Sequence, residues 1–126
     1  YIRRLETEGV NVWVLPAENM KVPFSEFKKK CYDVGINGIY FEGGSKLTSE
    51  LLHMRELDYH FNYRAPVLLG DDKAKPVYRG MRIEKLSQAI RLERVRNEVY
   101  GDDQLMRGFV SYPSRLDVDE TVFSNE

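Results

Sequence analysis

The residues best suited to chemistry form one short run, Phe41-Glu42-Gly43-Gly44-Ser45-Lys46-Leu47-Thr48. An apolar stretch precedes this run and leucines at helical spacing follow it, so we expect a strand, a glycine turn and a helix start. Backbone N–H groups at a helix N-terminus lack intrahelical partners, and the helix dipole adds partial positive charge there. Glycines let an anion approach the backbone, and nearby hydroxyl and ammonium groups add donors. The run therefore predicts a phosphate-binding turn, while a tight turn capped by the hydroxyls would use the same residues.

Glu42 stands at the end of the expected strand and is the best candidate for a carboxylate that contacts a ligand. Its oxygens can accept hydrogen bonds from a sugar hydroxyl or a ring N–H. The same carboxylate could instead satisfy nearby backbone donors. Residue type alone leaves both roles open.

The remaining reactive side chains do not form a catalytic or metal-binding set. His53 lies near the end of an expected helix and His60 on the polar face of an expected strand. Neither has a second ligand at metal spacing or a serine or cysteine placed for a triad, so we expect both to be solvated or supporting. Cys31 falls on an apolar helix face, which favours a buried, inert thiol. No metal site is predicted, and no catalytic residue can be named.

The elements that must position the glycine turn alternate in type. Residues 2–8 and 24–34 have the apolar spacing of helices, and a glycine follows each of them. Residues 11–15 and 36–41 are apolar runs typical of buried strands. The order helix, strand, helix, strand, helix predicts an α/β fold in which helices cover a parallel sheet.

The second half of the chain changes to a period of two, because Leu57, Tyr59, Phe61 and Tyr63 alternate with polar residues. This alternation predicts a strand with one apolar face. Further on, residues 92–100 and 104–112 flank a Gly-Asp-Asp turn and predict a closing antiparallel hairpin. The sequence becomes polar from Pro113, so we expect residues 1–112 to form the domain portion and 113–126 a polar tail.

Composition narrows the function classes. Nineteen Lys and Arg residues balance twenty Asp and Glu residues, which argues against binding nucleic acid or an anionic membrane surface. One cysteine excludes an internal disulfide framework and fits a reducing setting. Without a signal-peptide pattern or a long apolar run, we expect a cytoplasmic protein. Tyr1 begins the sequence inside an expected helix, which suggests a piece of a longer chain.

Five short motifs are more specific together, in their order and spacing, than any one of them alone. They are Gly35-Ile36-Asn37, Phe41-Glu42-Gly43-Gly44, Leu47, Ala65-Pro66-Val67-Leu68-Leu69-Gly70 and Gly101-Asp102-Asp103-Gln104-Leu105-Met106-Arg107-Gly108. Across roughly residues 2–112 the sequence resembles the C-terminal portion of the reductase domain of bacterial riboflavin-biosynthesis deaminase-reductases. The resemblance implies a dihydrofolate-reductase-like mixed sheet with helices on its faces.

The resemblance also implies an activity and site residues. That family uses NADPH to reduce the ribosyl ring of 5-amino-6-(5-phosphoribosylamino)uracil to the ribityl product, so an NADPH-dependent oxidoreductase is implied, with Glu42 contacting the substrate. The residues implied to hold the phosphates of NADPH are Gly43, Gly44, Ser45, Lys46, Leu47, Thr48, Ser49 and Glu50.

The resemblance places the family's catalytic acid and most of its substrate pocket upstream of Tyr1, so we expect the isolated chain to be inactive. The zinc signature of the family's deaminase half, which would make the protein multifunctional, is absent from this sequence. The alternative is a non-catalytic structural subdomain that forms a homodimer. Its interface would use residues 57–69 and the hairpin, with Tyr59, Phe61 and Tyr63 packing on one face.

Overall fold

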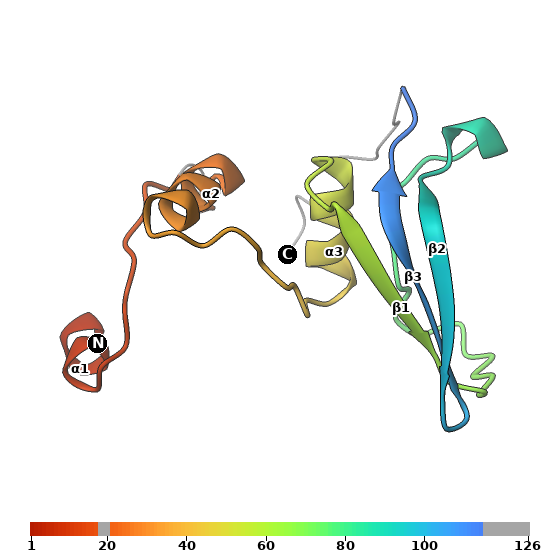
Figure 1. The fold of residues 1–126 in the computed structure, drawn as a ribbon, viewed down its shortest axis with the longest axis horizontal. Coiled ribbons are helices and arrows are strands. Elements are labelled where there is room, and N and C mark those ends of the chain that lie inside the picture. Colours follow the sequence, from red (N-terminus) through yellow and green to blue (C-terminus); the bar gives the residue numbers. More distant parts are fainter. Residues whose placement is uncertain (18–20, 115–126) are drawn as a thin grey trace. The chain divides into compact units, whose positions relative to one another are not determined.

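A computed structural model describes residues 1–17 and 21–114, and the expected polar tail from 115 onward lies outside the described residues. The chain divides into two compact units, Tyr1–Tyr40 and Phe41–Glu126 (Figure 1). The combination of helices and a sheet confirms the predicted α/β class. Among the described residues, no helix is both long enough and apolar enough to cross a membrane.

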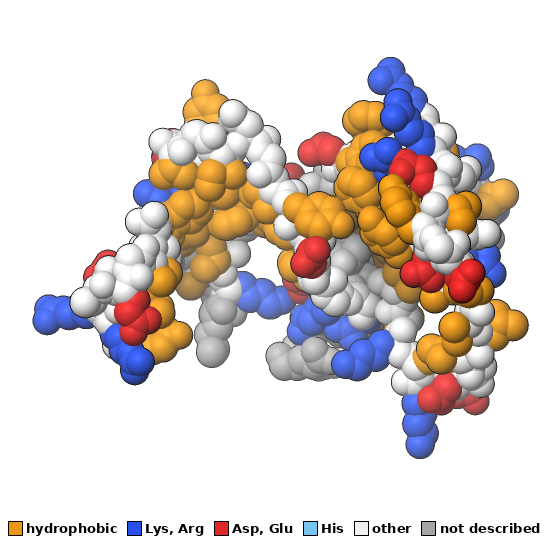
Figure 2. All heavy atoms as spheres, turned by 60° about the horizontal axis from the view of Figure 1, so that its bottom comes forward, with side chains coloured by type: hydrophobic (Ala, Val, Ile, Leu, Met, Phe, Trp, Pro, Cys, Tyr) orange, Lys and Arg blue, Asp and Glu red, His pale blue; other side chains and the backbone are white. Residues whose placement is uncertain are grey.

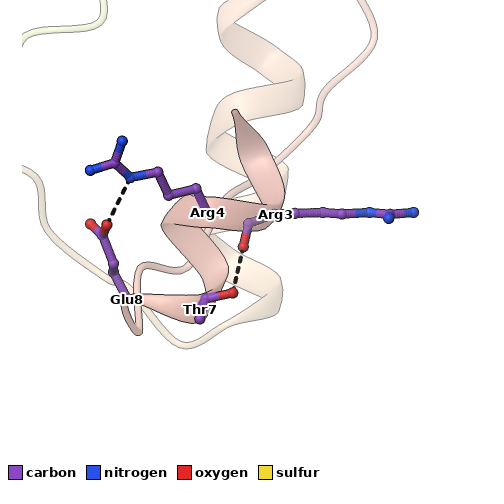
Figure 3. A network of polar contacts seen from close by, with 4 residues as sticks. All are labelled: Arg3, Arg4, Thr7 and Glu8. Atoms are coloured by element: carbon purple, nitrogen blue, oxygen red, sulfur yellow. Dashed lines mark hydrogen bonds and ion pairs between the residues drawn. The ribbon is translucent and has the colours of Figure 1, made fainter.

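The first unit contains two helices, α1 (Ile2–Thr7) and α2 (Phe24–Asp33). In α1, the Arg4 guanidinium pairs with Glu8 at 3.0 Å, and the Thr7 hydroxyl donates to the Arg3 carbonyl at 2.8 Å (Figure 3). Both partners of the ion pair are exposed, so the pair contributes little stability. Both contacts are local, joining residues four positions apart in α1 and its C-terminal cap.

The apolar face of α2 packs mainly through aromatic rings. Phe27 lies between Phe24 and Trp13, with ring centroids 5.8 and 6.5 Å away. Cys31 is buried, as predicted from its position on this face. The helix ends before Gly35, where the Ile36 amide returns to the Cys31 carbonyl at 2.9 Å. The amphipathic helix expected at 24–34 is therefore confirmed.

The buried strands predicted at 11–15 and 36–41 are wrong for this structure. Neither segment is assigned as a strand, and Val14 and Tyr40 are 78% and 62% exposed. The physical reason is that a strand must exchange backbone hydrogen bonds with a neighbouring strand, whereas a helix satisfies its own backbone. Among the described residues these two segments have no paired strand, and the described sheet is antiparallel rather than parallel or mixed.

The second unit contains α3 (Ser45–His53), β1 (Tyr59–Arg64), a 3₁₀ turn (Leu86–Gln88), β2 (Arg91–Tyr100) and β3 (Asp103–Ser111). The strands form an antiparallel sheet in the order β1-β3-β2, so β3 is central (Figure 1). β2 and β3 form the predicted closing hairpin. Gly101 has a φ of 60° in its turn, a backbone conformation that glycine adopts without strain.

The core of the second unit is small. Among its described residues, the buried apolar side chains are Leu51 and Leu52 of α3 and Leu105 of β3. Beyond β3, the Tyr112 hydroxyl donates to the Leu57 carbonyl at 3.0 Å and accepts from the Leu57 amide at 3.1 Å. These two bonds fix the end of β3 beside the segment that joins α3 to β1.

The two faces of the sheet differ in character. On one face Tyr59 packs edge-on against Phe109 at 4.9 Å, and Arg107 donates to Glu98 at 2.7 Å. His60 and Asn62 project to the opposite face, because successive strand residues alternate sides.

Hydrophobic side chains also lie at the surface of both units (Figure 2). Among the described residues, Leu68 is one of these, at 93% exposed.

Candidate functional site

The glycine turn leads directly into α3, as the sequence predicts. Gly44 is the N-terminal cap residue, with φ −71° and ψ 179°, and as a glycine it makes no side-chain cap bond to α3. The Thr48 hydroxyl lies 3.4 Å from the Gly43 carbonyl, and the Thr48 amide donates to the Gly44 carbonyl at 3.1 Å. Because glycine has no side chain, the cap residue itself offers no acceptor to the amides of the first helical turn.

The two glycines have different surroundings. A Cβ atom at Gly43 would stand 2.5 Å from Leu47 Cδ2 and 3.0 Å from Leu47 Cβ, so Leu47 would have to shift. A Cβ atom at Gly44 would meet nothing within 4 Å. Because the backbone of Gly44 is extended, any residue could adopt it. Gly43 thus makes room for Leu47, whereas Gly44 leaves the approach to the helix N-terminus open.

The electrostatics of the turn suit an anion. The first turn of α3 has no acidic residue, and the helix dipole places partial positive charge at the same end. Lys46 adds a cationic side chain within this turn. His53 lies in the last turn of α3, where the dipole is negative. The charge order along α3 is therefore compatible with phosphate at its N-terminus.

The predicted site residues do not all face solvent. Glu42 and both glycines are exposed at the turn, and Ser45, Lys46 and Thr48 are partly exposed. Leu47 is 39% exposed. The exception is Ser49, which is fully buried; its hydroxyl accepts from the Arg79 amide at 2.9 Å.

Ser49 and Glu50 were also predicted to hold the phosphates of NADPH, but they lie further along α3 than the other predicted residues. Ser49 links α3 to the segment before β2, and Glu50 follows it, partly exposed, in the second turn. Both therefore lie beyond the first-turn amides that an anion would approach. The structure brings residues 42–48 together at one end of α3, and the binding roles of Ser49 and Glu50 stay predictions.

The sequence interpretation missed a second polar group, the pair formed by His60 and Tyr78. His60 Nε2 is hydrogen-bonded to the Tyr78 hydroxyl, and both side chains line a pocket on one sheet face. Burial lowers the pKa of His60 and raises the pKa of Tyr78. Sequence alternation placed His60 on a polar strand face, and the mixed charged and apolar residues that follow Tyr78 give no clear signal that this face is covered. Among the described residues, no cluster of three potential metal ligands is present.

Comparison with known proteins identifies the family of the chain. Residues 2–106 match the profile of the RibD C-terminal domain. The riboflavin biosynthesis protein RibD of Actinobacillus pleuropneumoniae is 30% identical over 112 residues, which cover 89% of this chain and 30% of that relative. The chain thus spans about 30% of the length of this curated relative. Because the profile match covers most of the chain, the chain belongs to the RibD C-terminal domain family.

Proposed function

We propose that this chain is the C-terminal part of a pyridine-nucleotide-dependent reductase of riboflavin biosynthesis. Its hydride donor would be NADPH, and its substrate 5-amino-6-(5-phosphoribosylamino)uracil, whose ribosyl ring is reduced to the ribityl chain. Family membership and the similarity to a riboflavin biosynthesis protein support this proposal. The observation that carries it is the N-terminus of α3, where the cap residue Gly44 has no side chain and a Cβ atom would meet nothing within 4 Å.

The residues of the turn fit a nucleotide phosphate. The first-turn amides of α3 would donate to the phosphate oxygens, and the Lys46 ammonium would neutralise part of their charge. At Gly44 the missing side chain keeps this approach free, since a Cβ atom there would occupy open space. NADPH, when bound, supplies the hydride for the reduction.

Glu42 precedes the turn and is exposed, so its carboxylate is available to a ligand. We assign it to the substrate, where it would accept a hydrogen bond from a sugar hydroxyl or a ring N–H. This contact would hold the sugar in position for hydride transfer. We propose a cytoplasmic setting for the reaction.

The decisive test compares turnover by the full-length protein and by the 126-residue chain. We expect the full-length protein to oxidise NADPH when the pyrimidine substrate is added, as followed by absorbance at the nicotinamide band. The isolated chain should show no turnover, since it spans about 30% of its RibD relative. An inactive full-length protein would contradict the reductase assignment, and an active isolated chain would contradict the need for the rest of the protein.

A second candidate function is structural, with the chain forming a homodimer through its sheet. The observation that favours it is an aromatic sheet face in which Phe109 and Tyr63 are 47% and 61% exposed beside Tyr59 and Phe61. Such a face can pack against a second copy. Sedimentation of the chain should give a dimer mass that Phe61→Lys converts to a monomer; a monomer at every concentration would contradict this function.

A further inference from the structure

A pocket of about 370 Å³ lies within the second unit, away from the glycine turn. Its floor is one face of the sheet, where His60 and Asn62 of β1 stand beside Met106 of β3 in the strand register. Leu92 of β2, Val110 of β3 and Leu52 of α3 also line the pocket. Leu52 follows Gly44 by eight helical positions, a rise of about 12 Å. The pocket is therefore distinct from the proposed phosphate site.

The opposite wall of the pocket comes from the segment between β1 and β2, which contributes Tyr78, Met81 and Ile83. Two hydrogen bonds anchor the middle of this segment, at Tyr78 and Arg79. Tyr78 is hydrogen-bonded to His60, and the Arg79 amide donates to the buried Ser49 hydroxyl at 2.9 Å. The wall is thus joined to both β1 and α3, which favours a pocket that exists before any ligand arrives.

The side chains that line the pocket indicate which kind of ligand it can bind. Among the described residues, no Asp, Glu, Lys or Arg side chain lines the pocket, so a charged ligand would lose hydration without gaining an ion pair. Most lining side chains are aliphatic or thioether groups, and the thioethers of Met81 and Met106 make favourable contacts with aromatic rings, so an apolar aromatic body fits this lining. Polar groups are contributed by the Tyr78 hydroxyl, the His60 imidazole and the Asn62 amide, which together offer donors and acceptors.

We propose that this pocket binds an uncharged aromatic molecule that carries an amide-type group. The ring would lie against the apolar walls, and the amide would hydrogen-bond to Asn62 and Tyr78. This inference does not depend on the reductase assignment, because it involves neither the glycine turn nor Glu42.

The test uses three probes of the same shape and different charge: benzamide, benzoate and benzamidinium. Each is titrated into the ¹⁵N-labelled full chain near pH 7.5, and backbone amide shifts are followed by NMR. We expect benzamide to shift the amides of His60, Asn62 and Met106, with a dissociation constant roughly in the millimolar range for so small a ligand. Both charged probes should bind about tenfold more weakly. Equal binding of all three, preference for a charged probe, or benzamide shifts confined to other residues would overturn the proposal.

Two variants and one control localise the binding. Asn62→Leu and Tyr78→Phe each remove one polar partner and should weaken benzamide binding about fivefold. Tyr100→Phe is the matched control, because it removes the same hydroxyl from a residue whose partner is Glu98, outside the pocket. If Asn62→Leu does not fold, benzamide binding by Tyr78→Phe tests the proposal on its own. Unchanged binding in the folded variants, or equal weakening in Tyr100→Phe, would overturn the proposal.

Discussion

The two units of this chain differ in how their backbone groups find partners. In the first unit α1 and α2 satisfy their own amides, and Cys31 is the one buried apolar side chain of its described residues. In the second unit β3 pairs on both sides, and Leu51, Leu52 and Leu105 are buried around it. A helix forms its backbone hydrogen bonds within its own segment, whereas strands form only where a neighbour is available. Apolar runs without such a neighbour stay extended and exposed.

The largest expected effect is on stability, and it distinguishes a buried side chain of the second unit from an exposed one of the first. Leu51→Ala removes a side chain with no exposed surface and should lower the free energy of unfolding by about 2–5 kcal/mol. Val14→Ala is the control in the first unit, where the side chain is 78% exposed, and should change it by less than about 0.5 kcal/mol. Urea denaturation of both variants measures the difference. Similar losses would mean that residues 11–15 are packed as firmly as α3.

A smaller effect concerns the pH dependence of the second unit. Burial lowers the pKa of His60 in the folded chain, so the unfolded chain binds more protons as the pH falls through His60's ordinary range near 6.5. The free energy of unfolding should therefore decrease between about pH 7.5 and 5.5. The loss ends once the pH falls below the lowered folded pKa.

The matched comparison for this pH effect is His60→Gln, which keeps a polar side chain and removes the titrating group. Urea titrations at both pH values should show a smaller decrease in this variant than in the parent chain. An equal decrease in both proteins would assign the pH dependence to other groups.

Much of the second unit could be predicted from sequence because its signals are local. Leucine spacing located α3, alternation located β1, and Gly101 with its two aspartates located the hairpin turn. The strands expected at 11–15 and 36–41 did not form, because hydrophobicity indicates burial but does not supply a pairing partner.

Two features of the sites could not be predicted from sequence. Gly43 and Gly44 are adjacent and chemically identical, so only the position of Leu47 distinguishes the packing glycine from the open one. The pairing of His60 with Tyr78 depends on how the chain between β1 and β2 returns to the sheet, and that segment has no periodic pattern. Motif chemistry located the turn, while tertiary contacts located the pocket.

The central claim, that the Gly43-Gly44 turn holds the phosphate of NADPH, is tested most directly by the dissociation constant of NADPH in the full-length protein. Gly44→Val places a branched side chain where the anion approaches and should weaken binding at least about tenfold. Gly38→Val is the matched control, because a Cβ atom at Gly38 also meets nothing within 4 Å and lies outside the turn. Weakened binding in Gly44→Val alone is the predicted result. An unchanged dissociation constant in a folded Gly44→Val protein would contradict the claim and leave the turn a structural feature of α3.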